Sequence, residues 1–272
     1  MRKRIQPKPN DESRPRKVEG VKRKQVEDVK KIKVEGTRLN KVIADSGLTS
    51  RRGADHLIEF GRVKVNGKLV SDLGRRVSAD DRIMVDEKLI TKAERHVYMI
   101  LNKPKNVITT TKDERGRKTV LDLMRTRERI YPVGRLDRNT TGVLILTNDG
   151  EFANRMMHPK YKVQRVYNVV LDKPLEIKTA KQISYGVELE NGEVTQPCEL
   201  FIADNDRYKV TIILTEGKNR EVRRMFEVHD YKVTKLDRIE YGGISKKGIR
   251  QGDYRQLTRE ETNHLKKLLK MY

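Results

Sequence analysis

Apolar and polar residues follow two different patterns along this chain, and the change of pattern divides it. Between Thr37 and about Lys92, apolar residues recur twice at helical spacing and then at every second position. This order predicts two short helices followed by strands. From His96 to Tyr272, short alternating runs dominate, which predicts many strands with a few helices between them.

Local signals set the boundaries of the elements in the first region, 37–92. Ser46-Gly47 ends the first predicted helix, and a hydroxyl side chain at Thr49 or Ser50 caps the second. Asn66-Gly67 is a strong signal for a two-residue hairpin. The prediction is a small αα–β module whose apolar positions are Leu39, Val42, Ile43, Ala54, Leu57, Ile58, Val63 and Val65.

The second region, 96–272, is predicted to form one α+β domain with a largely antiparallel sheet. A capping box, Thr258 with Glu261, marks the start of its last helix. The expected strands are Tyr98–Leu101, Ile130–Val133, Val143–Thr147, Arg165–Leu171 and Val210–Leu214, and the expected helices are Glu151–Met157, Arg220–Val228 and Thr258–Lys270.

Charge changes this picture in two ways. Residues 1–36 hold 13 basic and 6 acidic residues with few apolar ones, which predicts a basic disordered tail. The whole chain of 272 residues has a net charge of +22. Such an excess favours a polyanionic partner, above all a nucleic acid. A membrane surface is the weaker alternative, because no apolar run is long enough to cross a bilayer.

The residue types that bind metals or form disulfides are sparse. The single cysteine, Cys198, cannot form an internal disulfide, which fits a cytoplasmic protein. No metal site is expected, since the five histidines lack ligand spacing. No glycine-rich phosphate loop is present either, and no cofactor is expected.

Arg51 and Arg52 fall in the first turn of the second predicted helix. The helix dipole disfavours cations there by about 0.3–1 kcal/mol, so local stability does not explain them. An RNA phosphate bound at this helix start would explain them, although two solvated arginines remain the alternative.

The segment from Gly134 to Gly142 is a polar loop between two apolar strands, and Asp137 lies in it between two arginines. A carboxylate between cations is held ionised, which suits a nucleophile better than a general acid. Taken alone, Asp137 reads more simply as a turn or ion-pair aspartate.

Four stretches of the chain resemble known families. TRLNKVIADSGLTSRRGADHLIEFGRVKVNGKLV, from Thr37 to Val70, resembles the small RNA-binding domain named after the fourth small-subunit ribosomal protein. GRLDRNTTGVLILTNDG, from Gly134 to Gly150, resembles the signature of RsuA-like ribosomal RNA pseudouridine synthases. YMILNKP and EGKNREVRRMF, beginning at Tyr98 and Glu216, agree with that family in content and order.

The resemblance implies a role for each matching residue. Asp137 would be the nucleophile, Arg223 the basic residue that pairs with it, and Tyr167 the ring that stacks on the uracil. Arg135 would help to displace the base from its stack, and Val222 would pack beside it. Further RNA contacts are expected from Arg224, Asn102, Lys103, Arg51 and Arg52.

Several of these residues have simpler interpretations. Tyr167 alternates with Val169 and fits an ordinary core position, while Asn102 and Lys103 fit a strand end before a turn. Asn148-Asp149-Gly150 is expected to be a turn and helix cap. Asn139 departs from the family pattern, where an acidic residue is frequent, and Val143 and Ile145 replace leucines. Glu221 stands where other members carry glutamine, which points to the large-subunit branch.

The resemblance therefore predicts an isomerase that converts a specific uridine of ribosomal RNA, in the large subunit, to pseudouridine without a cofactor. The substrate is expected to be a bulged or looped uridine, in free RNA or in a pre-ribosomal particle. The main alternative is a non-catalytic ribosome-assembly protein that only binds RNA. A nuclease or hydrolase is less consistent, because metal-ligand clusters and a histidine relay are missing.

Overall fold

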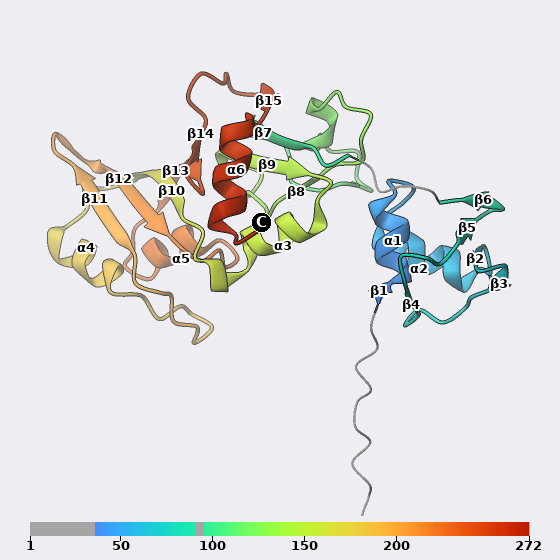
Figure 1. Ribbon diagram of the computed structural model, residues 1–272. Helices are drawn as coiled ribbons and strands as arrows, with labels where there is room; N and C mark the ends of the chain where they lie inside the picture. The colour runs from blue at the N-terminus through green and yellow to red at the C-terminus, as the bar shows by residue number, and fades with distance from the viewer. Residues whose placement is uncertain (1–35, 91–94, 272) are drawn as a thin grey trace, which may run out of the picture. The chain divides into compact units, whose positions relative to one another are not determined.

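The computed structural model describes residues 36–90 and 95–271. The predicted basic tail, 1–36, lies outside the described residues except for Gly36, and so do 91 and 92 at the end of the predicted small module. The fold is α+β as predicted, with two helices and small sheets in the first described stretch and a mixed, mostly antiparallel sheet in the second (Figure 1).

In residues 36–90, helices α1 (Leu39–Asp45) and α2 (Arg51–Glu59) pack against each other. Ser50 caps α2, since its side chain accepts a hydrogen bond from the backbone N of Gly53 at 2.9 Å. The buried side chains of both helices lie on one face, as their spacing predicted, and include Leu39, Ile43, Ala54 and Ile58.

The strands of this module form two antiparallel sheets. Asn66 and Gly67 both have positive φ, 52° and 78°, and form the hairpin turn that the sequence predicted. The larger sheet has the order β3-β2-β5-β6, and β1 pairs with β4. The bounds are β1 (Thr37–Arg38), β2 (Val63–Val65), β3 (Lys68–Leu69), β4 (Arg76–Val77), β5 (Ile83–Val85) and β6 (Lys88–Leu89).

Residues 95–271 are built on one sheet with the order β11-β12-β10-β13-β9-β7-β15, to which β14 and β8 add as partners of β13 and β9. Its described pairings are antiparallel except for that of β13 with β9. The strands are β7 (Tyr98–Lys103), β8 (Tyr131–Pro132), β9 (Thr141–Thr147), β10 (Arg165–Leu171), β11 (Glu199–Ala203), β12 (Asp206–Leu214), β13 (Val233–Tyr241), β14 (Ile244–Ser245) and β15 (Tyr254–Gln256).

Helices cover this sheet at both ends (Figure 1). Near β7 and β9, α3 (Gly150–Met157) and α6 (Arg259–Leu268) share one apolar cluster. Near β11 and β12, α4 (Ile177–Ser184) and α5 (Glu221–Glu227) share another. Two 3-10 turns lie at Leu121–Leu123 and Pro159–Tyr161. The capping box predicted at Thr258 is present.

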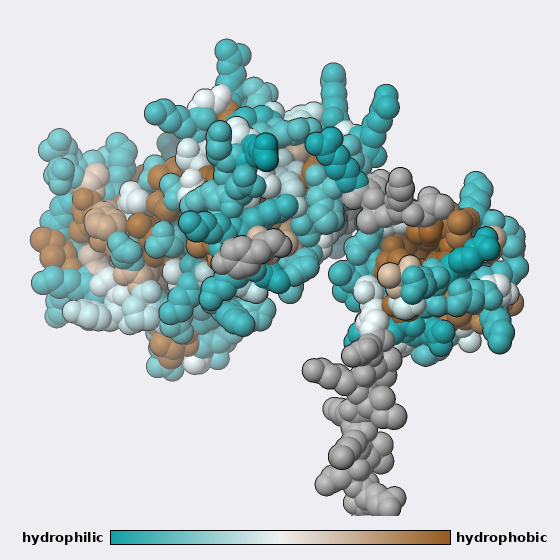
Figure 2. Space-filling view, in the orientation of Figure 1, coloured by the Kyte–Doolittle hydropathy of each residue, from teal (hydrophilic) through white to brown (hydrophobic). Residues whose placement is uncertain are grey.

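The neighbouring strands β7 and β9 are buried on both faces. Met99 and Leu144 belong to the apolar cluster on one face, whereas Ile100 and Ile145 belong to the cluster on the other. A strand covered on both sides needs apolar residues at every position, which explains the unbroken apolar run of β9. Figure 2 shows the opposite on the visible surface, where hydrophilic residues dominate.

Candidate active site

The polar loop 134–140 joins β8 to β9 and carries Asp137. The backbone N of Thr140 donates to the carbonyl of Asp137 at 3.1 Å, which closes a turn around the acid. From a neighbouring segment, Thr109 Oγ1 donates to the carbonyl of Leu136 at 2.8 Å. The backbone on both sides of Asp137 is therefore held by hydrogen bonds.

The strongest support for this loop comes from Lys103 at the end of β7. Its side chain is completely buried, and Nζ donates to four backbone carbonyls. The acceptors are Pro104, Asp137, Arg138 and Thr140, at 3.0, 3.0, 3.3 and 2.9 Å. Lys103 was expected to contact RNA. The structure corrects this expectation, because a buried ammonium that holds the loop does not face a ligand.

Burial also changes the acidity of Lys103. It lowers the pKa of the ammonium to about 8, although the charge of Asp137 acts in the opposite direction. The group stays cationic at neutral pH because it is surrounded by carbonyl oxygens and lies close to a carboxylate. Its proton is nevertheless lost more easily than that of a surface lysine.

Asp137 faces Arg223, which lies on α5. Arg223 Nε is 4.0 Å from Asp137 Oδ2, and the two side chains are 13 % and 39 % exposed. Arg223 Nη1 donates to the carbonyl of Val233 at 2.7 Å, which fixes the guanidinium between the helix and β13. Burial lowers the pKa of Arg223, and the charges of Arg220 and Asp137 act in opposite directions. The structure thus brings together the expected acid and its expected basic partner.

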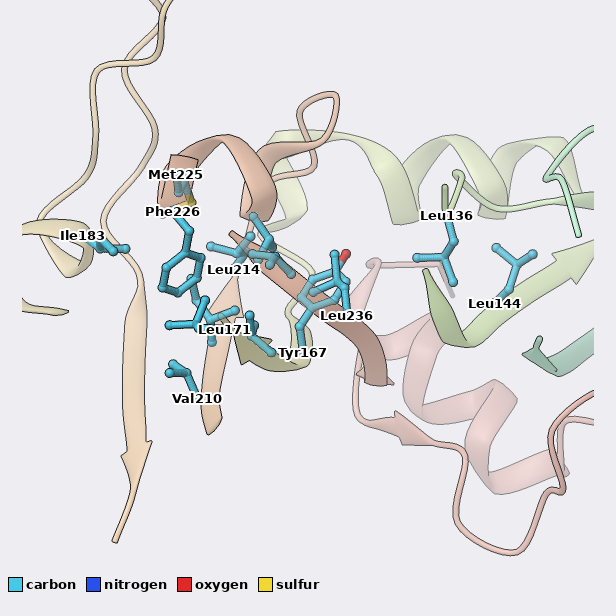
Figure 3. Packing of buried hydrophobic residues seen from close by; sticks show 14 of the residues in the cluster. Leu136, Leu144, Tyr167, Leu171, Ile183, Val210, Leu214, Met225, Phe226 and Leu236 are labelled. Carbon is cyan, nitrogen blue, oxygen red and sulfur yellow. The ribbon is translucent and has the colours of Figure 1, made fainter. Parts of the chain in front are cut away.

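A pocket of about 170 Å³ opens beside Asp137. Tyr167, buried to 8 % exposure, forms part of its wall, as does Val222 at the start of α5. Figure 3 shows the ring of Tyr167 beside Leu236, with Leu214 close by and Leu136 on the far side. The structure therefore places Asp137, Tyr167 and Val222 around one small pocket, with Arg223 within ion-pair distance of Asp137. Arg135, which also lines the pocket, is exposed.

Two buried arginines that the sequence analysis did not single out also line this pocket. Arg165 and Arg238 lie on Tyr241, with Cζ 5.1 and 4.6 Å from the ring centroid. Arg238 Nε donates to the carbonyl of Val143 at 2.7 Å, while its Nη2 has no acceptor among the described residues. Cations that line a pocket for a polyanionic ligand give the pocket a positive electrostatic potential.

The sequence does contain a signal for Arg165. Arg165 begins β10, and strand alternation places its side chain on the same face as that of Tyr167, two residues later. Arg238 carries no such signal, because β13 was not among the predicted strands.

Arg224 and Asn102 are placed differently from their expected RNA-contact role. Both are buried, at 9 % and 6 % exposure. Arg224 Nε donates to Glu190 Oε1 at 3.0 Å and Nη2 donates to Asn191 Oδ1 at 2.6 Å, so the guanidinium is bound within the protein. Asn102 Nδ2 donates to the carbonyl of Ile249 at 2.8 Å. Their donors are occupied by the fold, which corrects both expectations.

The remaining candidates can be placed simply. Arg51 and Arg52 are exposed in the first turn of α2, and Arg51 Nη2 reaches Asn40 Oδ1 at 3.4 Å. Asp149 caps α3, as expected, by accepting hydrogen bonds from the backbone N of Glu151 and the next residue.

Comparison with known proteins identifies the family. Residues 97–228 match the model of RNA pseudouridylate synthases, and 37–83 match the S4 domain. The ribosomal large subunit pseudouridine synthase B of Bacillus subtilis (strain 168) is 44 % identical over 236 residues, 85 % of this chain and 96 % of that protein. The chain belongs to the RNA pseudouridine synthase family. It is an isomerase, as the resemblance predicted.

Two further comparisons agree with this family. The dual-specificity RNA pseudouridine synthase RluF of Escherichia coli (strain K12) is 37 % identical over 234 residues, 85 % of this chain and 79 % of that protein. A crystal structure of a pseudouridylate synthase has a TM-score of 0.63 and 31 % identity, covering 85 % of this chain and 100 % of that one. The predicted α+β catalytic fold is confirmed.

The S4 domain gives the pseudouridine synthase its RNA-binding module, and the two exposed arginines of α2 lie within it. Within 36–90 and 95–271, no helix is long and apolar enough to cross a membrane. In the same residues, no cluster of three or more histidine, cysteine or acidic side chains is arranged to hold a metal ion.

Proposed function

We propose that this pseudouridine synthase modifies a bulged or looped uridine of large-subunit ribosomal RNA, with Asp137 as nucleophile. The observation that supports the site is the pairing of Asp137 with Arg223 beside a pocket walled by Tyr167. The relative from Bacillus subtilis supports the substrate, because its name states that it acts on the large ribosomal subunit. Glu221 stands where other members of the family carry glutamine, and this difference also fits the large-subunit branch.

The reaction is an isomerisation and needs no oxidant or energy source. The N1–C1′ bond of the uridine breaks, the uracil turns and a C5–C1′ bond forms. The proton on C5 is released and N1 takes up a proton, so the product is an isomer of the substrate. The carboxylate of Asp137 attacks either C6 of the base or C1′ of the sugar, and both routes require the same fixed negative charge.

The other pocket residues then have distinct tasks. Arg223 orients the carboxylate of Asp137. Tyr167 stacks on the uracil and keeps water from it while the base is detached, and Val222 packs beside it. Arg135, at the exposed rim, helps to displace the base from its stack. Because unstacking costs less in a loop or bulge than in a duplex, such uridines are the favoured targets.

Release of tritium from C5 of labelled uridine tests this proposal. Large-subunit ribosomal RNA should lose its label without added metal or nucleotide, and small-subunit RNA should keep it. Asp137→Asn retains the size of the side chain but removes the nucleophile, so the rate should fall by at least about 10³-fold while RNA binding changes by less than about twofold.

Asp204→Asn is the matched control, since Asp204 is an exposed aspartate in the turn between β11 and β12. Its rate should equal that of the wild type. Full activity of Asp137→Asn would refute the assignment of the nucleophile. A protein that binds the RNA but releases no tritium at all would instead be a non-catalytic binding protein.

A further inference from the structure

The loop 215–220, between β12 and α5, forms one side of the uridine pocket. Gly217, Lys218 and Arg220 line the pocket. Gly217 lies against the guanidinium of Arg165: a Cβ placed on this glycine would be 3.5 Å from Arg165 Cζ. The position of this short loop therefore sets the width of the pocket next to Arg165.

Two carboxyl side chains attach this loop to the domain. Glu221 is 4 % exposed, and its Oε2 accepts a hydrogen bond from the backbone N of Lys218 at 3.0 Å. The Glu216 side chain is 15 % exposed, and its Oε1 accepts from the backbone N of Gln196 at 2.6 Å. Both bonds close the loop onto the rest of the fold.

The second oxygen of Glu221 faces no donor. Within the described residues, Glu221 Oε1 is buried and has no hydrogen-bond partner, and the neighbouring side chain is the carboxyl of Glu216. The carboxyls of Glu216 and Glu221 converge on Lys218, which meets the first through Nζ and the second through its backbone N. Two carboxylates gathered around one residue repel, and a proton on one of them removes the repulsion.

The charged and titratable groups around this pair are few. Lys218 Nζ is 3.6 Å from Glu216 Oε2, but it also donates to the carbonyl of Val194 at 2.5 Å. Cys198 faces Glu221 from the start of β11, and burial raises the pKa of its thiol to about 11, so the thiol is neutral. Arg165 and Arg220 lie near the same loop, but within the described residues neither forms an ion pair with Glu216 or Glu221. Lys218, whose side chain is 25 % exposed, is thus the cation in ion-pair contact with this carboxyl pair, through Glu216.

The acidity of Glu221 reflects these surroundings. Burial first, and then the hydrogen bond and charge of Glu216, raise the pKa of Glu221 from 4.5 to about 7, although the backbone N and the charge of Lys218 act the other way. The carboxyl of Glu221 thus changes its protonation near neutral pH.

We propose that Glu216 and Glu221 share one proton, and that this proton holds loop 215–220 in the position that fits a uridine. The link to uridine rests on the proposed function of the pocket, whereas the shared proton does not. Glu221 itself lines the pocket. It is assigned as a positioning residue because its carboxyl binds the backbone of the loop, through which it acts. Loss of the proton leaves two carboxylates that repel, and the loop then moves away from Arg165.

The effect on stability has a definite sign. The folded protein keeps the proton of Glu221 up to about pH 7, while the ordinary value for an unfolded chain is 4.5. The folded state therefore binds more protons between these values, and the stabilisation is complete below pH 4.5 and is lost as pH rises to 7. The wild type should melt at a lower temperature at pH 8 than at pH 5.

Glu221→Gln tests the proposal, because the amide keeps the shape and always carries the hydrogens that Glu216 needs. The melting temperature of this variant should equal that of the wild type at pH 5 and exceed it by at least about 3 °C at pH 8. Glu260→Gln, which changes an exposed glutamate of α6, should follow the wild type at both pH values.

Activity gives a second readout. From pH 6 to pH 8, kcat/KM of the wild type should fall by up to about tenfold, as expected for a group that must be protonated and has a pKa near 7. In Glu221→Gln, kcat/KM should fall by no more than about twofold over the same range. That remaining loss is the one expected from Lys103, whose pKa of about 8 leaves half of the groups deprotonated at pH 8. Glu221→Leu, which cannot bind the backbone of Lys218, should be less active than the wild type at every pH.

Identical melting curves for Glu221→Gln and the wild type at pH 8 would refute the shared proton, whatever the activity. If Glu221→Gln shows the expected gain in melting temperature at pH 8 but the same dependence of kcat/KM on pH as the wild type, the link between the loop and the pocket is refuted. The proposed function fails by a separate result, the retained activity of Asp137→Asn, and the melting comparison stands without it.

Discussion

Asp137 can act as a nucleophile only while the backbone of its loop stays in place, and a single side chain carries much of that task. Lys103 donates to four carbonyls, three of which belong to loop 134–140. The carbonyls of Asp137 and Arg138 also accept from the backbone N of Thr140 and Asn106. Loss of the ammonium should therefore cost most at the carbonyl of Thr140, because a buried acceptor without a donor costs about 1–3 kcal/mol. The ammonium of Lys103 and the guanidinium of Arg223 also place two positive charges close to the carboxylate of Asp137.

Replacement of this lysine should damage both the fold and the reaction. Lys103→Met keeps the length and removes the donors, so the free energy of unfolding should fall by about 2–4 kcal/mol and kcat by at least about tenfold. Denaturant unfolding and tritium release measure the two effects. Lys105→Met, at an exposed position, is the control and should change neither. A Lys103→Met enzyme with normal kcat would show that the loop needs no such support.

At the scale of elements, the site depends on the parallel contact between β13 and β9. Gly142 pairs with Arg238 in this register, and its φ is +105°. A Cβ on Gly142 would lie 2.1 Å from the carbonyl oxygen of Arg238, which is backbone and cannot move aside. The glycine thus lets β9 approach β13 at the point where the Asp137 loop ends and Arg238 enters the pocket.

Gly142→Ala should separate these two strands locally. Strain at positive φ and the clash together predict a loss of about 3 kcal/mol or more in the free energy of unfolding, with a matching loss of activity. Gly116→Ala is the control for backbone strain alone, because Gly116 also has positive φ, +67°, but a Cβ there meets nothing within 4 Å. Equal destabilisation of the two variants would contradict the role of close approach.

At the scale of the whole molecule, a net charge of +22 gives the enzyme a strong general attraction to RNA. This attraction does not select a site. The S4 domain adds a module in which Arg51 and Arg52 stand at the start of α2, where helix energetics do not favour them. We therefore expect these two arginines to bind RNA phosphates.

Salt dependence distinguishes this contact from general charge. Arg51→Ala combined with Arg52→Ala should weaken binding of a large-subunit RNA fragment and reduce the slope of log Kd against log salt by about 1–2. Lys178→Ala combined with Lys181→Ala removes the same charge from exposed positions of α4 and should change the slope little. Filter binding over a range of salt measures both. Equal losses would mean that only net charge matters.

The sequence predicted those parts of the fold that local pattern controls. Strand β10 alternates cleanly, so its predicted bounds agree with the structure, and the turn at Asn66-Gly67 depends only on local φ preferences. Strand β13 and helix α4 were not among the predicted elements. The exposed and buried positions of β13 do not alternate cleanly, since its pairing with β10 shifts register twice, opposite Val166/Tyr167 and opposite Val170/Leu171.

The site shows the same division at the level of single residues. Asp137, Tyr167 and Arg223 could be named from their motifs. Arg223 and Arg224 are adjacent, but successive helix residues point about 100° apart. One therefore faces Asp137, and the other is bound by the carboxylate of Glu190.

The sequence by itself determined the α+β class, the S4 module and the family, because periodicity, turn residues and contiguous motifs are properties of neighbours along the chain. The tertiary structure decided which cations serve the site. Whether Lys103, Arg165, Arg224 or Arg238 meets RNA, the loop backbone or another side chain depends on burial and on partners far away in the sequence. No local pattern specifies these, since pairing between distant strands brings the partners together.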